Sequence, residues 1–263
     1  MTLTWSGEVG QRTVLAGVLA AVLVISSSGV ALGQVTPGEW HTYTYRGPAT
    51  ISVATLKIPA SAWRHFEKAR SLALKHRAAE SETESGKALA IAPTFAAAHI
   101  LQASQQLALK DYAGAIANVD QARKSEPDAQ WSGLILAGAY NSLRRYGDAM
   151  EVILSLDGSE AECWQAKYEH ARAAIGLGDV DEALRWSSAA WEAAPHNFSD
   201  AILMRSNALI LAHHWTEASD KLYAYLAMPG AQPHREEARA ALDNVTQRMK
   251  AEHKPQGVTL ASR

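Results

Sequence analysis

The sequence predicts an all-α protein built from tandem pairs of helices, and two observations support this fold class. Prolines recur at a fixed 34-residue step, because Pro127 follows Pro93 by one step, Pro195 follows Pro127 by two, and Pro229 follows Pro195 by one. The composition is rich in alanine and contains only 3 Phe, which suits closely packed helices better than a broad sheet core. A constant period of this length is typical of a helical repeat architecture.

Rows of small residues keep the same 34-residue step. Small side chains are expected where the two antiparallel helices of a repeat approach most closely, because only Ala, Gly or Ser fits there. Several rows in phase over four units cannot arise from alanine richness alone. The rows are Ala69, Ala103, Ala137 and Ala171; Ser81, Ala115, Ala149 and Ala183; and Ala88, Ala122, Leu156 and Ala190, in which Leu156 is the one larger residue.

The predicted turn between the two helices has a recurring sequence. Residues 110–116 (KDYAGAI) and 178–184 (GDVDEAL) lie at equivalent positions. Both resemble the turn motif Gly-Asp-Tyr-x-x-Ala-Ile of the tetratricopeptide repeat family. The resemblance implies a right-handed superhelical solenoid of about five 34-residue helix–turn–helix repeats plus a C-terminal capping helix. The third unit departs from the pattern, since Ala161 replaces its proline, and the fifth matches only after a one-residue insertion near residues 196–198.

The pattern divides the chain into five parts. Residues 1–33 are expected to be a signal peptide, 34–60 a linker, 61–229 the repeat array, 230–250 the capping helix and 251–263 a disordered tail. The helix pairs are expected at 61–92, 94–126, 128–156, 159–194 and 197–228, and the last helix at 233–250.

The N-terminal part has the layout of a secretory signal peptide. Val14 to Ile25 form an apolar run preceded by Arg12, and Ala31-Leu32-Gly33 provides a small-x-small cleavage site before Gln34. The run is shorter than the roughly 20 apolar residues of a spanning helix. We therefore expect an exported protein, periplasmic or secreted, and membrane anchoring only if the segment is retained.

The linker contains two β-prone segments, Trp40–Tyr45 and Thr50–Ile58. Gly47-Pro48 lies between them, so a short β-hairpin is expected there. An isolated hairpin is marginal in water, so it would have to lean on the first helices.

Composition and motifs favour a binding protein over an enzyme. The net charge of −2 has mixed signs, which disfavours nucleic-acid binding. The single cysteine, Cys163, excludes an intrachain disulfide and a zinc site of several thiolates. The 10 histidines have no companions at metal-ligand spacing, and no catalytic or phosphate-binding motif occurs. We therefore expect no enzymatic activity, cofactor or metal.

The family resemblance implies that the first helices of successive repeats line a concave groove that binds a partner. The subgroup that grips acidic peptide termini uses Lys at the fifth position of a repeat, whereas that position is apolar here, which disfavours this activity. The alternative is that some of these side chains are packed core, or that residues 35–60 cover the groove. The implied groove residues are Trp63, Phe66, Arg70, Ile100, Trp131, Leu134, Asn141, Tyr168, Arg172, Leu203 and Asn207.

The expected function is therefore a non-enzymatic scaffold that binds a peptide or helix of a partner protein outside the cytoplasm. A second hypothesis is a self-assembling module whose groove is filled by its own N-terminal segment or by another copy. A third is an enzyme or metal-binding protein without a recognisable motif. The sequence leaves the partner and the oligomeric state open.

The signal-peptide hypothesis predicts the mature N-terminus. Protein recovered from the producing cell should begin near Gln34, because cleavage follows the small-x-small site. N-terminal sequencing measures this directly. Soluble protein that begins at Met1 would contradict export, and an intact N-terminus on membrane material would favour the retained anchor.

Overall fold

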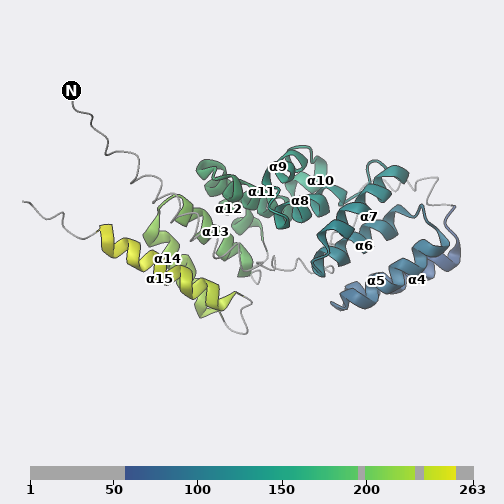
Figure 1. Cartoon of the computed structure of the whole chain (residues 1–263), viewed down its shortest axis with the longest axis horizontal. Helices are drawn as coiled ribbons and strands as arrows, with labels where there is room; N and C mark the ends of the chain where they lie inside the picture. The colour runs from purple at the N-terminus through teal and green to yellow at the C-terminus, as the bar shows by residue number, and fades with distance from the viewer. Residues whose placement is uncertain (1–56, 195–198, 229–233, 253–263) are drawn as a thin grey trace, which may run out of the picture. The chain divides into compact units, whose positions relative to one another are not determined.

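The computed structural model describes residues 57–194, 199–228 and 234–252 (Figure 1). The predicted signal peptide, the hairpin up to residue 56, the insertion near 196–198 and residues 253–263 of the tail lie outside the described residues. The described residues fall into two compact units, one containing 57–194 and the other 199–228 and 234–252. No described helix combines the length and apolarity needed to cross a membrane.

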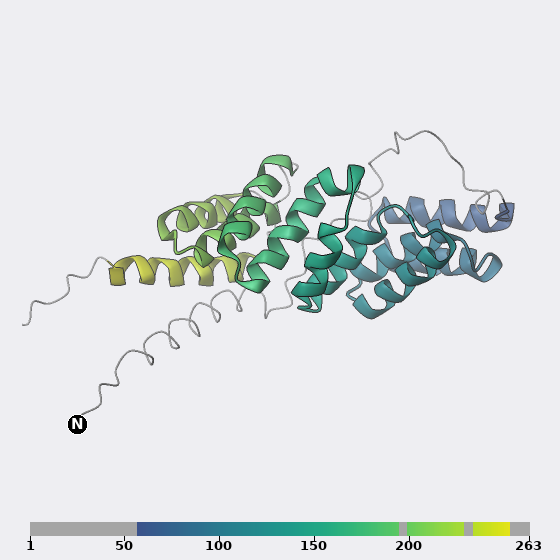
Figure 2. The same cartoon turned by 90° about the horizontal axis from the view of Figure 1, so that it is seen from above.

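The first unit is a succession of helices in which each packs against its neighbours in sequence (Figure 2). Eight of these helices form four pairs, and a short helix, α10, stands between the third pair and the fourth. The pairs are α4 (Ala60–Ala73) with α5 (Ala78–Ile91), α6 (Ala96–Ala108) with α7 (Tyr112–Ser125), α8 (Ser132–Ser142) with α9 (Tyr146–Leu154), and α11 (Trp164–Leu177) with α12 (Val180–Ala193); α10 is Gly158–Glu162.

The second unit contains α13 (Ser199–Leu211), α14 (Trp215–Ala227) and α15 (Arg235–Glu252). Helix α14 packs against both of the others. The apolar stripe of α15 is buried, and it consists of Ala238, Ala241, Leu242 and Val245. All the described elements in both units are helices, so the predicted all-α class of sequential helix pairs is confirmed.

The backbone repeats the 34-residue period at the turn inside each helix pair. One residue of each turn has a positive φ, between 57° and 76°. The next residue donates its N–H to a carbonyl five positions earlier, as Asp111 does to Gln106 and Asp179 to Ala174. The fifth turn comes one residue late, which agrees with the one-residue slip in the sequence pattern. The positive-φ residues are His76, Lys110, Arg144, Gly178 and His213.

The predicted rows of small residues lie where the paired helices meet. Ala69, Ala103, Ala137 and Ala171 are all 0% exposed. The second row faces them, since the hydroxyl of Ser81 donates a hydrogen bond of 2.8 Å to the carbonyl of Ala69. Only side chains of this size let two helix backbones come so close.

The connection between the third and fourth pairs differs from the sequence expectation. The fourth pair was expected from residue 159, but α11 begins at Trp164 and the separate helix α10 precedes it. Trp131 was expected inside a helix, yet it has a φ of 69° and precedes the first residue of α8. Its N–H donates to the carboxylate of Glu160. A tertiary contact across 29 residues therefore fixes the start of α8.

The small-residue rows predict a large effect of overpacking. Ala171→Leu should lower the free energy of unfolding by about 1–3 kcal/mol, because added methyl groups in a packed interior force side chains and backbone to shift. Chemical unfolding followed by circular dichroism measures the loss. Ala117→Leu, at an exposed position of α7, is the control and should change stability little. Equal stability of the two variants would contradict the helix contact.

Candidate binding surface on the first helices

The first helices of neighbouring pairs share one continuous face. Helix α4 contacts α6, α6 contacts α8, and α8 contacts α11. Gly138 lies where side chains of two other first helices meet α8, because a Cβ there would lie 3.3 Å from Leu107 of α6 and 3.6 Å from the carboxylate of Glu169 of α11. The face therefore joins three helices at one residue that has no side chain. We call it the first-helix face.

A buried polar cluster lies on this face between α8 and α11. The Asn141 amide nitrogen donates hydrogen bonds of 2.9 Å to the backbone carbonyl and to the Oε2 atom of Glu169. The guanidinium of Arg172 contacts the same oxygen at 2.7 Å. Because Glu169 and Arg172 neutralise each other, the cluster is polar but carries no net charge.

Several amide atoms on the same helices are buried but lack hydrogen-bond partners. The Oδ1 atom of Asn141 accepts no hydrogen bond, because the two acceptors on Glu169 hold the amide nitrogen and direct the oxygen away from them. Gln165 is 1% exposed and both its amide atoms are unpaired. It lies four residues before Glu169, on the same helix face. Further unpaired atoms are the Oε1 atoms of Gln102 and Gln105 and, in the second unit, Oδ1 of Asn207.

Unpaired buried polar atoms are unusual in folded proteins and each requires an explanation. An unpaired amide atom costs roughly 1–3 kcal/mol of desolvation. In the first unit such atoms occur on α6, α8 and α11, which are all first helices. These first helices therefore hold buried amide atoms whose hydrogen-bonding capacity is not used within the described protein.

The structure divides the groove residues implied by the sequence into packed and polar groups. Phe66, Leu134, Tyr168 and, in the second unit, Leu203 are buried among the helices. Their burial favours the packed-core alternative for these side chains. Trp63, Ile100 and Trp131 are half-buried against core clusters.

The polar groove residues have different surroundings. Arg70 is exposed and pairs with Glu67 of its own helix at 2.8 Å. Asn141 and Arg172 meet at Glu169, a residue that the repeat pattern did not single out. The spacing of Glu169, four residues after Gln165 and three before Arg172, was the available signal, since such residues share a helix face. Asn207 lies on α13, in the second unit.

Burial shifts the pKa of two ionisable groups, one in α10 and one at the start of α11. It raises the pKa of the Glu160 carboxyl and of the Cys163 thiol. Cys163 is buried at the N-terminus of α11, where its sulfur accepts a hydrogen bond from the N–H of Ala166. A thiol with a raised pKa stays protonated and is a poor nucleophile. Its surroundings are therefore those of a structural cap.

His170 takes part in a separate contact between α11 and α12. Its ring stacks on Trp186 with centroids 4.3 Å apart, and its Nε2 atom lies 3.2 Å from the carboxylate of Glu182. Burial lowers the pKa of His170 below its usual value despite this carboxylate. The imidazole is therefore neutral near pH 7, and it joins the two helices of the fourth pair.

Across the described ranges, no three His, Cys, Asp or Glu side chains are grouped so as to hold a metal ion. Comparisons with protein-family models and with curated proteins give no match to this chain. The candidate site is therefore defined by its own geometry, as a neutral and hydrogen-bonding face on stacked helices.

The contact between Asn141 and Glu169 predicts a measurable loss of stability. Asn141→Ala should lower the free energy of unfolding by about 1–3 kcal/mol, because the backbone carbonyl and the carboxylate of Glu169 both lose the hydrogen bond from Asn141, and the carboxylate keeps only Arg172. Urea unfolding measures this change. The neighbouring Ser142→Ala is the control, since its hydroxyl bonds only to Gly138 of the same helix. Equal effects of the two changes would show that the interhelix bond does not form.

Proposed function

We propose that this protein is an exported scaffold of the tetratricopeptide type, without catalytic activity, that binds a segment of a partner protein on its first-helix face. The helix pairs, the 34-residue period of the turns and the contacts between successive first helices support the resemblance to that family. The binding site is the polar seam between α8 and α11, which consists of Gln165 and the polar cluster of Asn141, Glu169 and Arg172.

One observation carries the proposal, namely the two unpaired amide atoms of buried Gln165. A glutamine amide has an NH2 donor and an oxygen acceptor. It can therefore pair with the C=O and the N–H of a main-chain peptide unit. The half-buried Trp131 lies nearby, because it packs on the cluster that contains Ala166. The side chain of Arg172 is 13% exposed. These two side chains provide first contacts for a segment that then reaches Gln165.

The chemistry of the face indicates an extended segment of the partner. In a helix the main-chain groups are already paired internally, so they cannot satisfy the amides of Gln165 and Asn141. An extended chain keeps its N–H and C=O groups available. The balanced pair of Glu169 and Arg172 gives no excess of positive charge, so an acidic peptide terminus is not favoured. The proposed ligand is therefore a largely uncharged, extended peptide segment.

Gln165→Leu tests the proposal, because its effects on stability and on binding should have opposite signs. Removing unpaired buried polar atoms should leave the free energy of unfolding unchanged or raise it. Loss of the proposed hydrogen bonds should lower the affinity for the partner by about tenfold or more. The partner is captured from the native envelope fraction, identified by mass spectrometry and titrated against each variant.

Gln121→Leu, at an exposed position of α7, makes the same chemical change away from the face and should leave binding intact. Undiminished binding by folded Gln165→Leu would place the partner elsewhere on the protein. Capture of this chain alone would favour the self-assembling module.

A further inference from the structure

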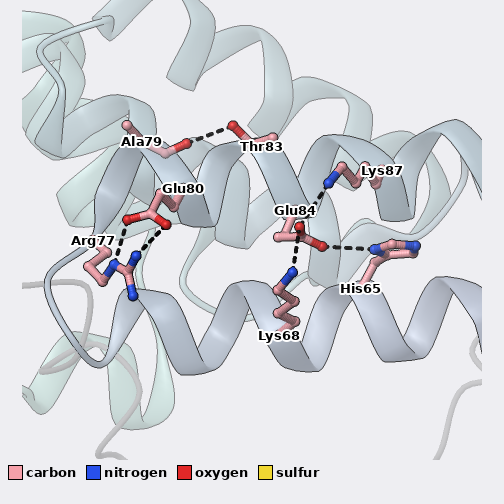
Figure 3. Close-up of polar contacts among 8 residues, drawn as sticks. All are labelled: His65, Lys68, Arg77, Ala79, Glu80, Thr83, Glu84 and Lys87. Carbon is pink, nitrogen blue, oxygen red and sulfur yellow. Dashed lines mark hydrogen bonds and ion pairs between the residues drawn. The ribbon is translucent and has the colours of Figure 1, made fainter.

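The first helix pair contains one buried carboxylate that is surrounded by two lysines and a histidine (Figure 3). Glu84 of α5 is 5% exposed. Its Oε2 atom lies 2.8 Å from His65, and its Oε1 atom lies 3.0 Å from Lys68 and 2.9 Å from Lys87. Hydrogen bonds from these three side chains, His65 first, lower the pKa of Glu84 to about 2. The carboxylate is therefore ionised at any physiological pH.

The shared carboxylate holds two ammonium groups close together at the surface. Both Nζ atoms contact the same oxygen of Glu84, so they cannot be farther apart than the two contact distances laid end to end. The side chains of Lys68 and Lys87 are 64% and 52% exposed. Each ammonium has three donors and directs one to Glu84. The remaining donors are available to one molecule that reaches both lysines.

The second helix pair shows that a joint between paired helices does not need this charge. Shifting the cluster by one repeat period leads to His99, Gln102, Asn118 and Gln121. The His99 ring contacts the Asn118 side chain at 2.7 Å, which repeats the contact of His65 with Glu84. Neutral amides thus replace the carboxylate and both lysines while the helices still pair. Helix pairing therefore does not require the carboxylate and the two lysines of the first pair.

The charge of the surrounding chain is also specific to this pair. Residues 57–91 contain seven Lys and Arg and four Glu, whereas residues 92–194 contain eight Lys and Arg and fourteen Asp and Glu. A basic first pair on an otherwise acidic unit attracts anions to one region. The segment with the excess positive charge, residues 57–91, is the one that contains Lys68 and Lys87.

We propose that Lys68 and Lys87, with His65, form a binding site for a phosphate-type oxyanion. One oxyanion with two or more oxygens bridges the two ammonium groups through charge-assisted hydrogen bonds, for which lysine is a common partner. Glu84 acts as a template, since it offsets the mutual repulsion of the cations and fixes their separation. The site is independent of the peptide-binding face proposed on α8 and α11.

Titration with inorganic phosphate, followed through backbone amide NMR shifts, tests the site in the full chain. Saturable shifts are expected at α4 and α5, with a Kd on the order of 1 mM for so exposed a site. Lys68→Gln and Lys87→Gln should each weaken binding about tenfold, the factor for loss of one charge-assisted hydrogen bond. Lys75→Gln removes the same charge from an exposed position of the same pair and should have little effect. Absence of saturable shifts, or equal weakening by Lys75→Gln, would overturn the proposal.

Glu84→Gln separates a templated site from general attraction to positive charge. The change makes the region more positive, so general attraction predicts tighter binding, whereas loss of the template predicts weaker binding. If this variant fails to fold, the combination Lys68→Gln, Glu84→Asn and Lys87→Gln reproduces the residues of the second pair. That variant should fold and bind no phosphate. Tighter binding by folded Glu84→Gln, or retained binding by the triple variant, would overturn the site.

Glycerol phosphate distinguishes the two sources of the ligand. A site for a phosphoryl group on a larger molecule should bind the ester as well as it binds inorganic phosphate. A site for the free ion should bind inorganic phosphate more tightly, because it uses the oxygen that the ester blocks. In both cases binding should depend on Lys68 and Lys87. If either compound binds equally well to the Lys68→Gln and Lys87→Gln variants, the proposal is contradicted.

Discussion

The close approach of paired helices at Ala69, Ala103, Ala137 and Ala171 is the constraint on which the rest of the first unit depends. Each of these methyl groups is completely buried, so the distance between backbones is set by the smallest side chain available. With its second helix held so closely, each first helix directs another face toward the first helices of neighbouring pairs. The contacts of α4 with α6, of α6 with α8 and of α8 with α11 follow from that geometry.

Contact between first helices brings together polar groups that are far apart in sequence. Asn141 reaches Glu169 across 28 residues, and Gly138 leaves room for that carboxylate. The side-chain oxygen of Asn141 is buried and has no hydrogen-bond partner in the described protein. The polar seam is therefore a consequence of helix packing. Its unpaired amide atoms lower the stability of the fold, and this is the physical reason to associate the seam with binding.

Repetition of the backbone does not impose repetition of chemistry. The turn residues have similar φ values in all five helix pairs, and the histidine contact between paired helices occurs in both the first and the second. The first pair adds a carboxylate and two lysines to this contact, and the second adds only amides. A stable repeat can thus carry different binding groups on each unit, since function lies in the side chains and not in the fold.

The sequence by itself determined the features that depend on local spacing. The repeat period, the buried small residues and the late fifth turn all follow from which residues recur along one helix or in one turn. It also placed Asn141 and Arg172 on a common surface. It did not show that Tyr168 is buried, that Glu169 joins these two residues, or that Trp131 stands outside α8 because Glu160 receives its N–H. Those features depend on contacts between helices far apart in the chain, and periodicity within a helix gives no distance between one helix and another. Only the tertiary structure decided them.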